Sequence, residues 1–159
     1  MYLLFILGLG STHWRLEMPK QGSGVIFFNT RKNAILLFRR DDKIFIPFPN
    51  MLDILGGGVE EGESPEDTVV REMSEELIDL RTGQSFVLQG QKPFLVYTDI
   101  RGCEQHIFSC EVDLEIGDLC LLEGKELVWL TEGELSAGAK LAFEFEEVLK
   151  AFFRQRHSA

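Results

Sequence analysis

Apolar runs separated by short polar segments dominate the first third of the chain. Gly24–Asn29 and Ala34–Phe38 are apolar and rich in residues that favour strands, and the polar segment Thr30–Asn33 lies between them. This pattern predicts a β-hairpin. Lys43–Phe48 also alternates between polar and apolar residues, but the prolines within and after it cannot donate to a sheet ladder. We therefore expect an edge strand or the entry to a loop there.

The next stretch carries the signals of a helix that begins at Ser64 and ends near Leu77. Serine is a favoured N-cap residue, and Pro65 suits the first helical position because the N–H that it lacks has no helical partner there. Glu66 and Asp67 place negative charge in the first turn, where the helix dipole stabilises it.

The remainder of the chain predicts strands followed by one closing amphipathic helix. The expected strands are Ser85–Leu88, Phe94–Thr98, His106–Val112 and Leu127–Leu130. The expected helix is Ala142–Gln155, in which apolar residues recur at helical spacing. The order of strands, helix, strands and helix indicates a mixed α/β or α+β domain.

Composition narrows the class of protein. The chain has 159 residues, of which 45% are hydrophobic and 26% charged, as in one ordered globular domain. Its net charge of −10 speaks against a binder of nucleic acid polymers, which needs a basic face. A small phosphorylated ligand stays compatible if a divalent cation lies between the two sets of negative charge. The three cysteines lack metal or C-x-x-C spacing, so we expect free thiols and a cytoplasmic location.

The first residues form a segment of their own. Tyr2–Leu7 is an apolar run that is too short to span a bilayer and lacks the basic start of a secretory signal. It is compatible with an extra strand, with an extension upstream of a natural start at Met18, or with a homodimer contact. We therefore treat residues 1–21 as an extension of uncertain structure and residues 22–159 as a single domain.

Acidic side chains gather on the predicted central helix. One face is apolar and contains Val70, Met73 and Leu77. The roughly opposite face carries a tight cluster of carboxylates, Glu72, Glu75 and Glu76, which Asp79 extends. Like charges at this spacing cost about 0.2–0.5 kcal/mol per pair, so the cluster favours a counter-charge. A hard cation such as Mg²⁺ or Mn²⁺ suits oxygen ligands without nearby His or Cys. The alternative is a solvated acidic helix face.

The spacing of these residues matches a known motif. Gly57, Glu63 and the run Arg71–Glu76 follow the pattern G-x5-E-x7-R-E-U-x-E-E. The stretch resembles the Nudix box, G-x5-E-x7-R-E-U-x-E-E-x-G-U, where U is a bulky apolar residue. Ile78 and Asp79 depart from it, because the box has glycine and an apolar residue at these positions. Glycine often ends a helix with positive φ, which isoleucine resists, so we expect the helix to end differently here.

The resemblance implies a fold, an activity and a cofactor. The fold would be an α/β/α sandwich with a central mixed β-sheet, and the activity would be that of a pyrophosphohydrolase. The Mg²⁺ or Mn²⁺ ligands that it implies are Glu72, Glu75, Glu76 and the backbone carbonyl of Gly57. Such ions neutralise diphosphate charge and activate a water molecule. Glu63 and Arg71 would orient the ligating glutamates.

Other site residues are less constrained by the motif. Glu111, in the predicted strand His106–Val112, is a candidate extra metal ligand or general base, and a solvent-facing strand glutamate is equally consistent with the alternation. Substrate contacts are expected from Arg39 and from the glycine triplet Gly56, Gly57 and Gly58.

The expected substrate is a small nucleotide with a phosphoanhydride bond. Nucleoside triphosphates, oxidised nucleotides, ADP-ribose and nucleotide sugars all fit this description. The rival hypothesis is a catalytically silent Nudix-fold module that binds nucleotides or regulates another process. Retention of all the charged positions of the box argues against the silent module.

Overall fold

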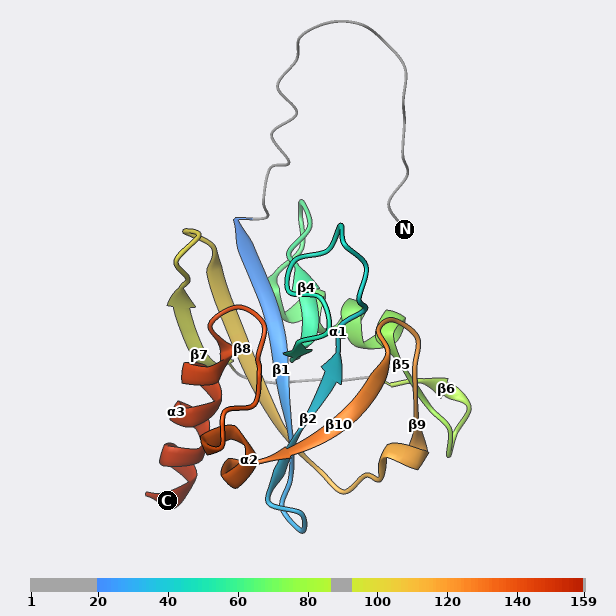
Figure 1. Ribbon diagram of the computed structural model, residues 1–159. Helices are drawn as coiled ribbons and strands as arrows, with labels where there is room; N and C mark the ends of the chain where they lie inside the picture. Colours follow the sequence, from blue (N-terminus) through green and yellow to red (C-terminus); the bar gives the residue numbers. More distant parts are fainter. Residues whose placement is uncertain (1–19, 87–92, 159) are drawn as a thin grey trace, which may run out of the picture.

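The computed structural model describes residues 20–86 and 93–158, and Figure 1 shows their arrangement. The strands are β1 (Gln21–Asn29), β2 (Ala34–Arg39), β3 (Leu52–Asp53), β4 (Leu55–Gly58), β5 (Leu77–Asp79), β6 (Gln84–Ser85), β7 (Pro93–Thr98), β8 (Glu104–Val112), β9 (Leu119–Leu121) and β10 (Glu126–Thr131). The helices are α1 (Pro65–Glu76), α2 (Glu132–Ser136) and α3 (Phe145–His157), with a 3₁₀ turn η1 (Ile116–Asp118).

A mixed sheet forms the centre of the domain. Its strand order is β10-β2-β1-β8-β7, while β3 pairs with β2 and β4 pairs with β1. β1 and β8 run parallel, and the other pairs are antiparallel. The predicted hairpin is confirmed, with Phe27 opposite Leu36 and with Asn33 at a φ of 49° in the turn. The mixed sheet and the α+β class are therefore as expected.

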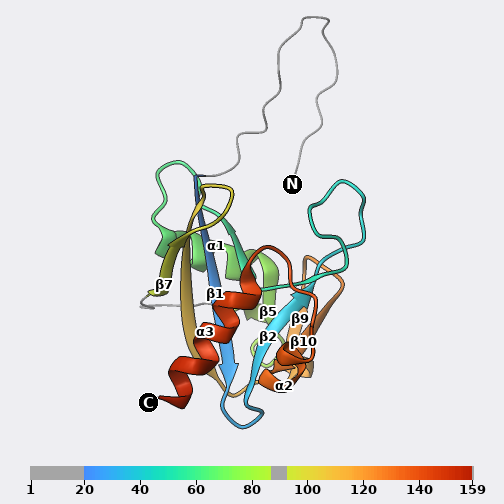
Figure 2. The same cartoon turned by 60° about the vertical axis from the view of Figure 1, so that its left-hand side comes forward.

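The two longer helices cover opposite faces of this sheet, as Figures 1 and 2 show. Val25 and Phe27 of β1 pack in one core with Val69 and Met73 of α1. Ile26 and Phe28 of β1 face the other core, which contains Val148, Leu149 and Phe152 of α3. Because both faces of β1 are covered here, its residues 25–28 form an apolar run without polar alternation.

A small second sheet lies beside the end of α1. Its strand order is β6-β5-β9, and β5 follows α1 without any intervening loop. The backbone N–H of Leu122, just after β9, donates to the carbonyl of Glu76 at 2.8 Å. The turn between β9 and β10 is therefore attached directly to the end of α1.

Several boundaries differ from the predictions. Ala142 precedes α3, which begins at Phe145. Residues 41–50 form turns rather than a strand, in agreement with the loop expected from their prolines. The short strands β3, β4, β5 and β9 and the short helix α2 were not predicted, because runs of two to five residues show too little periodicity. The N-terminal run Tyr2–Leu7 lies outside the described residues, as does the end of the predicted strand Ser85–Leu88.

Within residues 20–86 and 93–158, every helix is too short or too polar to cross a membrane.

Candidate active site

The start of α1 is fixed by its own sequence. The Ser64 hydroxyl accepts from the Asp67 backbone N–H at 3.1 Å, and the Asp67 carboxylate accepts from the Ser64 backbone N–H at 3.2 Å. This reciprocal capping box and Pro65 at the first helical position confirm the predicted start. The Ser23 hydroxyl of β1 donates to the Pro65 carbonyl at 2.6 Å, so the helix start is held against the central sheet.

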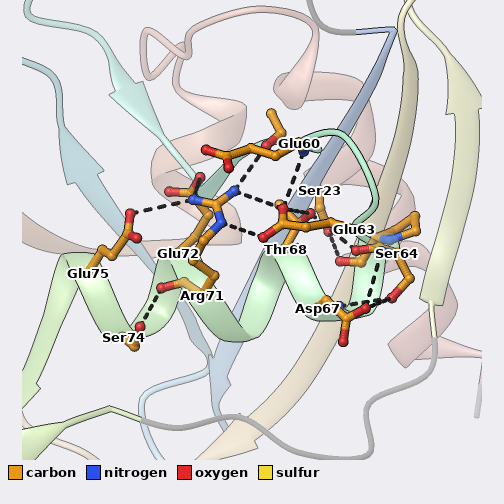
Figure 3. A network of polar contacts seen from close by, with 12 residues as sticks. Ser23, Glu60, Glu63, Ser64, Asp67, Thr68, Arg71, Glu72, Ser74 and Glu75 are labelled. Atoms are coloured by element: carbon orange, nitrogen blue, oxygen red, sulfur yellow. Dashed lines mark hydrogen bonds and ion pairs between the residues drawn. The ribbon is translucent and has the colours of Figure 1, made fainter. Parts of the chain in front are cut away.

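Arg71 is the hub of a polar network on α1, drawn in Figure 3. Its Nε and Nη2 donate to the two carboxylate oxygens of Glu63 at 2.7 and 3.1 Å. Nη2 also donates to the Gly58 carbonyl at 3.2 Å, and Nη1 donates to Glu72 at 2.8 Å. A longer contact of 3.4 Å joins Nη1 to Glu75. One guanidinium thus ties the glycine loop, the residue before the helix and two helical glutamates together.

Glu63 is the fixed anion of this network. Its hydrogen bonds from Arg71 hold its pKa at about 2, with help from the Thr68 hydroxyl and the Glu60 backbone N–H. The carboxylate is therefore ionised throughout the neutral range, where Arg71 is charged as well. Because Arg71 contacts Glu72, Glu63 acts on Glu72 through Arg71.

We expect Glu63→Gln to lower kcat by about 10- to 100-fold, the usual cost of losing a partner that orients a ligating side chain. Glutamine keeps the shape of Glu63 but cannot offer two anionic oxygens to Arg71. Steady-state kinetics with Glu66→Gln as the matched control measures this effect, since Glu66 is an exposed glutamate three residues later, in the first turn of α1. Equal kcat values for the two variants would contradict the role of Glu63.

Glu72 packs directly against the glycine loop. A Cβ atom added to Gly57 would lie 2.1 Å from Glu72 Oε1, so only glycine leaves room for the carboxylate there. Burial raises the pKa of Glu72, while the neighbouring Arg71 acts to lower it. The Gly57 backbone and the Glu72 carboxylate therefore lie against each other, as a shared ligand site requires.

Glu76 is a buried carboxylate without a basic partner among the described residues. It is 6% exposed, and its carboxylate accepts one hydrogen bond, from the Gly56 backbone N–H at 3.1 Å. Burial raises its pKa to about 9, and the nearby charges of Glu72, Glu123 and Asp53 act in the same direction. A carboxyl group in this setting is neutral at pH 7 unless a cation joins it. The donor set, all oxygen, fits a divalent cation such as Mg²⁺ or Mn²⁺.

The three box glutamates do not form the single tight cluster that their spacing predicts. Across residues 20–86 and 93–158, no three acidic, His or Cys side chains converge closely enough to hold an ion. The side chain of Glu75 is 60% exposed and turns toward Arg71. Like charges at this spacing repel, and the guanidinium of Arg71 attracts the exposed carboxylate of Glu75.

The apolar face of α1 also differs from the prediction. Val70 is 38% exposed, and Val69 takes its place in the core beside Met73 and Leu77. Glu76 follows Met73 by three residues and is therefore on the edge of the buried face rather than opposite it. This position explains why its carboxylate is so strongly desolvated.

Comparison with known proteins identifies the family of this chain. The family model described as the NUDIX domain matches residues 18–156. The chain belongs to the Nudix family. This match confirms the family resemblance of the box, and it extends over nearly the whole sequence.

Solved structures of Nudix proteins share the fold. Protein DR0079 from Deinococcus radiodurans has a TM-score of 0.65 at 18% identity and covers 88% of each chain. The MutT protein from Methanosarcina mazei Go1 has a TM-score of 0.63 at 22% identity, over 89% of this chain and 98% of that one. The NUDIX domain of Shewanella oneidensis NrtR, complexed with ADP ribose, has a TM-score of 0.64 at 18% identity, over 88% and 89%. No curated protein sequence matches.

The departures from the Nudix box have a local explanation. α1 ends at Glu76, and Leu77 is already extended, with a φ of −129° and a ψ of 136°. Ile78 lies in β5, where it pairs with Cys120 and Ser85, so no glycine with positive φ is needed. The Asp79 carboxylate caps the following turn, with Arg81 as its main partner. The helix therefore ends without the glycine, as expected, by passing straight into a strand.

Two predicted site residues lie elsewhere. Glu111 is opposite Phe28 and pairs with Arg156 of α3 at 2.7 Å. His106 lies five residues before Glu111 along β8, a distance of about 16 Å. His106 is opposite Ser23 of β1, and Ser23 is opposite Gly57 of the box. The structure therefore does not bring Glu111 to the Nudix box.

Arg39 is also committed to other partners. Its Nε pairs with Glu126 at 2.6 Å, and its Nη1 donates to the Asn50 carbonyl at 3.1 Å. It holds the base of the loop 41–50, and no hydrogen bond within residues 20–86 and 93–158 joins its side chain to the box.

A carboxylate that sequence reasoning missed does approach the site. Glu123 lies on the turn between β9 and β10, and its charge helps raise the pKa of both Glu72 and Glu76. The turn is tight because Gly124 has a φ of 104° and lies against Phe38. The only sequence signal was an acidic residue before a glycine, and the contact with α1 is made across more than forty residues.

Proposed function

We propose that the protein is a divalent-metal-dependent hydrolase that cleaves a phosphoanhydride bond in a nucleoside diphosphate linked to another group. The observation that carries this proposal is Glu76, a buried carboxylate whose pKa burial raises to about 9. Such a group costs stability when ionised, and a cation at that position would reverse the cost. Family membership supports a hydrolase, and Nudix hydrolases generally use divalent metals.

The chain offers ligands from two adjacent elements. We assign Glu72 and Glu76 of α1 and the Gly57 carbonyl of β4 to the cation, with Glu75 joining when its side chain leaves Arg71. When bound, the cation would neutralise the diphosphate and lower the pKa of a water molecule. Arg71, held by Glu63, keeps Glu72 against the glycine loop.

Glu123 is our candidate for the proton acceptor or for a further ligand. It is exposed, and it lies near enough to Glu72 and Glu76 for its charge to act on both carboxyl groups. Its loop is fixed to the end of α1 through the Leu122–Glu76 backbone hydrogen bond. These properties fit the role that Glu111 was expected to have, and Glu123 replaces Glu111 in our assignment.

We expect Glu123→Gln to lower kcat by about 10²- to 10⁴-fold, the range for loss of a general base. Glu111→Gln is the matched control, because Glu111 is also an exposed glutamate and lies at the far end of β8. Initial rates at saturating Mg²⁺ measure both effects. A large loss in the Glu111 variant with none in the Glu123 variant would overturn the assignment.

The activity itself is tested with a substrate panel. The purified protein is incubated with Mg²⁺ or Mn²⁺ and with nucleoside triphosphates, ADP-ribose and nucleotide sugars, and released phosphate, pyrophosphate or nucleoside monophosphate is measured. The proposal requires metal-dependent release from at least one compound. Nucleotide binding without turnover, at any metal concentration and at alkaline pH, would favour the silent module.

A further inference from the structure

Two ion pairs, each with a buried carboxylate and a partly exposed arginine, take no part in the box network. Asp53 is 4% exposed and pairs with Nη1 of Arg40 at 2.6 Å. Asp99 is 7% exposed and accepts from Nε of Arg101 at 2.9 Å, with a second contact from Nη2 of the same residue. Each buried carboxylate loses water and needs a charged partner, while its arginine stays partly exposed at 17% for Arg40 and 33% for Arg101.

An aromatic ring joins the two pairs. The guanidinium carbon of Arg101 lies 4.4 Å from the centre of the Phe143 ring, and that of Arg40 lies 5.5 Å from it. Phe48, from the loop 41–50, meets the same ring edge-on at 4.7 Å. We call Arg40, Arg101, Phe48 and Phe143 the Arg–Phe cluster. In Figure 2 the loop before α3, which carries Phe143, passes between the β7–β8 turn and the loop that precedes β3.

The backbone of the cluster is strained. Phe48 has a φ of 54° and Phe143 a φ of 52°, in the left-handed region that bulky side chains rarely adopt. Each such residue costs about 1–3 kcal/mol and persists where surrounding contacts demand it, which is common in ligand sites. That both strained aromatic residues contact each other indicates that the chain is shaped to keep these rings in place.

The floor of the cluster is built into the central sheet. Gln105 of β8 is 7% exposed and donates to Asp99 at 3.1 Å. Its amide lies against Gly22 of β1, where an added Cβ would come within 2.4 Å of its oxygen. On the other side, Asp53 precedes Gly56 of the glycine loop by three residues. The cluster is thus held by the same strands that carry the proposed metal site.

Each arginine has one terminal guanidinium nitrogen without a hydrogen-bond partner among the described residues. In the part of the chain that the structure describes, Arg40 uses Nε and Nη1, and Arg101 uses Nε and Nη2. No hydrogen bond there involves Nη2 of Arg40 or Nη1 of Arg101. The side chain of Arg101 is 33% exposed, so a ligand can reach it. Asp53 and Asp99 already accept hydrogen bonds from the two arginines. The cluster therefore presents hydrogen-bond donors.

We propose that the Arg–Phe cluster is the subsite for the heterocyclic base of the substrate and selects 6-oxopurines over 6-aminopurines. This inference rests on the proposed function. Guanidinium groups can only donate hydrogen bonds. A 6-oxopurine presents two acceptors, O6 and N7, on one edge, whereas adenine places an amino donor beside N7. A flat base also stacks on arginine and phenylalanine.

The test compares inosine and adenosine nucleotides, which differ at purine position 6. We expect kcat/KM to be about 5- to 100-fold higher for inosine triphosphate than for ATP, the range for a good arginine–base contact. Arg101→Ala should bring this ratio close to one, mainly through a higher KM for the inosine compound. Arg156→Ala is the matched control and should keep the ratio, since Arg156 also stacks on a phenylalanine, Phe28, but at the far end of β8.

Binding of the monophosphates by calorimetry separates this inference from the proposed function. Inosine monophosphate should bind more tightly than AMP, whether or not the protein hydrolyses any nucleotide. Absence of binding of either compound, or equal affinities, would overturn the subsite. Equal losses for both bases in Arg101→Ala would also overturn it, since they indicate a contact with phosphate. A thermal melt of each variant confirms that it is folded.

Discussion

Replacing Glu76 with glutamine is expected to lower kcat by about 10²- to 10³-fold, because the variant loses a ligand of a cation that supplies several kcal/mol to the transition state. Glutamine fills the same space, and its amide can still accept the hydrogen bond from Gly56. The variant should therefore fold. Initial rates over a wide range of Mg²⁺ concentration measure the loss, and rates restored by high Mg²⁺ would show that Glu76 contributes only to affinity.

The same substitution should change how stability depends on pH. The folded pKa of Glu76 is about 9, against an ordinary value of 4.5. Its contribution to stability is thus fully present below pH 4.5 and is lost as the pH rises through about 9. The slope from this one group approaches about 1.4 kcal/mol per pH unit within that window.

Metal-free wild-type protein should therefore lose stability between pH 5 and 9 more steeply than Glu76→Gln, which has no proton to release. Denaturation midpoints in the presence of a chelator measure the two slopes. Glu75→Gln is the control, since the Glu75 side chain is 60% exposed and should leave the slope unchanged. Identical slopes for wild type and Glu76→Gln would show that the buried carboxyl group is not the source.

Added Mg²⁺ should stabilise the folded protein as the pH rises, whereas the metal-free protein should lose stability. Because the ligating carboxylates must be ionised, metal binding displaces the proton of Glu76, and apparent metal affinity should rise with pH up to about 9. The melting temperature of the wild type should then increase with Mg²⁺ at pH 8, while that of Glu76→Gln should change little.

Alanine at the two adjacent glycines should give two different kinds of damage. In Gly57→Ala the new Cβ would meet the Glu72 carboxylate at 2.1 Å, and a carboxylate at the end of a flexible side chain can move. The variant should fold with Glu72 displaced, and kcat should fall by about a hundredfold, as displacements near 1 Å do. In Gly56→Ala the Cβ would meet the Ser23 carbonyl oxygen at 2.2 Å, at a φ of 142°. Backbone atoms of β1 cannot give way, so we expect a loss of about 1–3 kcal/mol in unfolding free energy.

Chemical denaturation and steady-state kinetics on both variants separate these outcomes. Gly57→Ala should keep the denaturation midpoint within a small margin of wild type and lose turnover. Gly56→Ala should have a lower denaturation midpoint than wild type. A fully active Gly57→Ala variant would mean that the position of Glu72 against the loop is not needed for catalysis.

Local signals in the sequence predicted the parts of this protein that depend on neighbours along the chain. The start of α1 follows from Ser64 and Pro65, whose effects act within one helical turn. The hairpin of β1 and β2 follows from two apolar runs and a short polar turn. The spacing of the Nudix box likewise identified the family.

The features of the site that the sequence did not predict depend on contacts between residues far apart in the chain. Alternation placed Glu111 on a strand but could not tell which end of that strand lies near the box. Glu123 reaches the site only because β9 pairs with β5 beyond the end of α1. Helical spacing grouped three glutamates, whereas burial of Glu76 and the pull of Arg71 on Glu75 divide them in space. Ile78 departs from the pattern of the box, and its pairing with Cys120 of β9 explains the departure.

The central claim is that Glu72 and Glu76 hold a divalent cation against the glycine loop. Anomalous diffraction from crystals grown in Mn²⁺ tests it without reference to turnover. We predict a peak bounded by these two carboxylates and the Gly57 carbonyl, at ligand distances of about 2.0–2.3 Å, and no such peak in Glu76→Gln. Saturating Mn²⁺ with no peak there, and with Glu76 still joined only to the Gly56 N–H, would contradict the account.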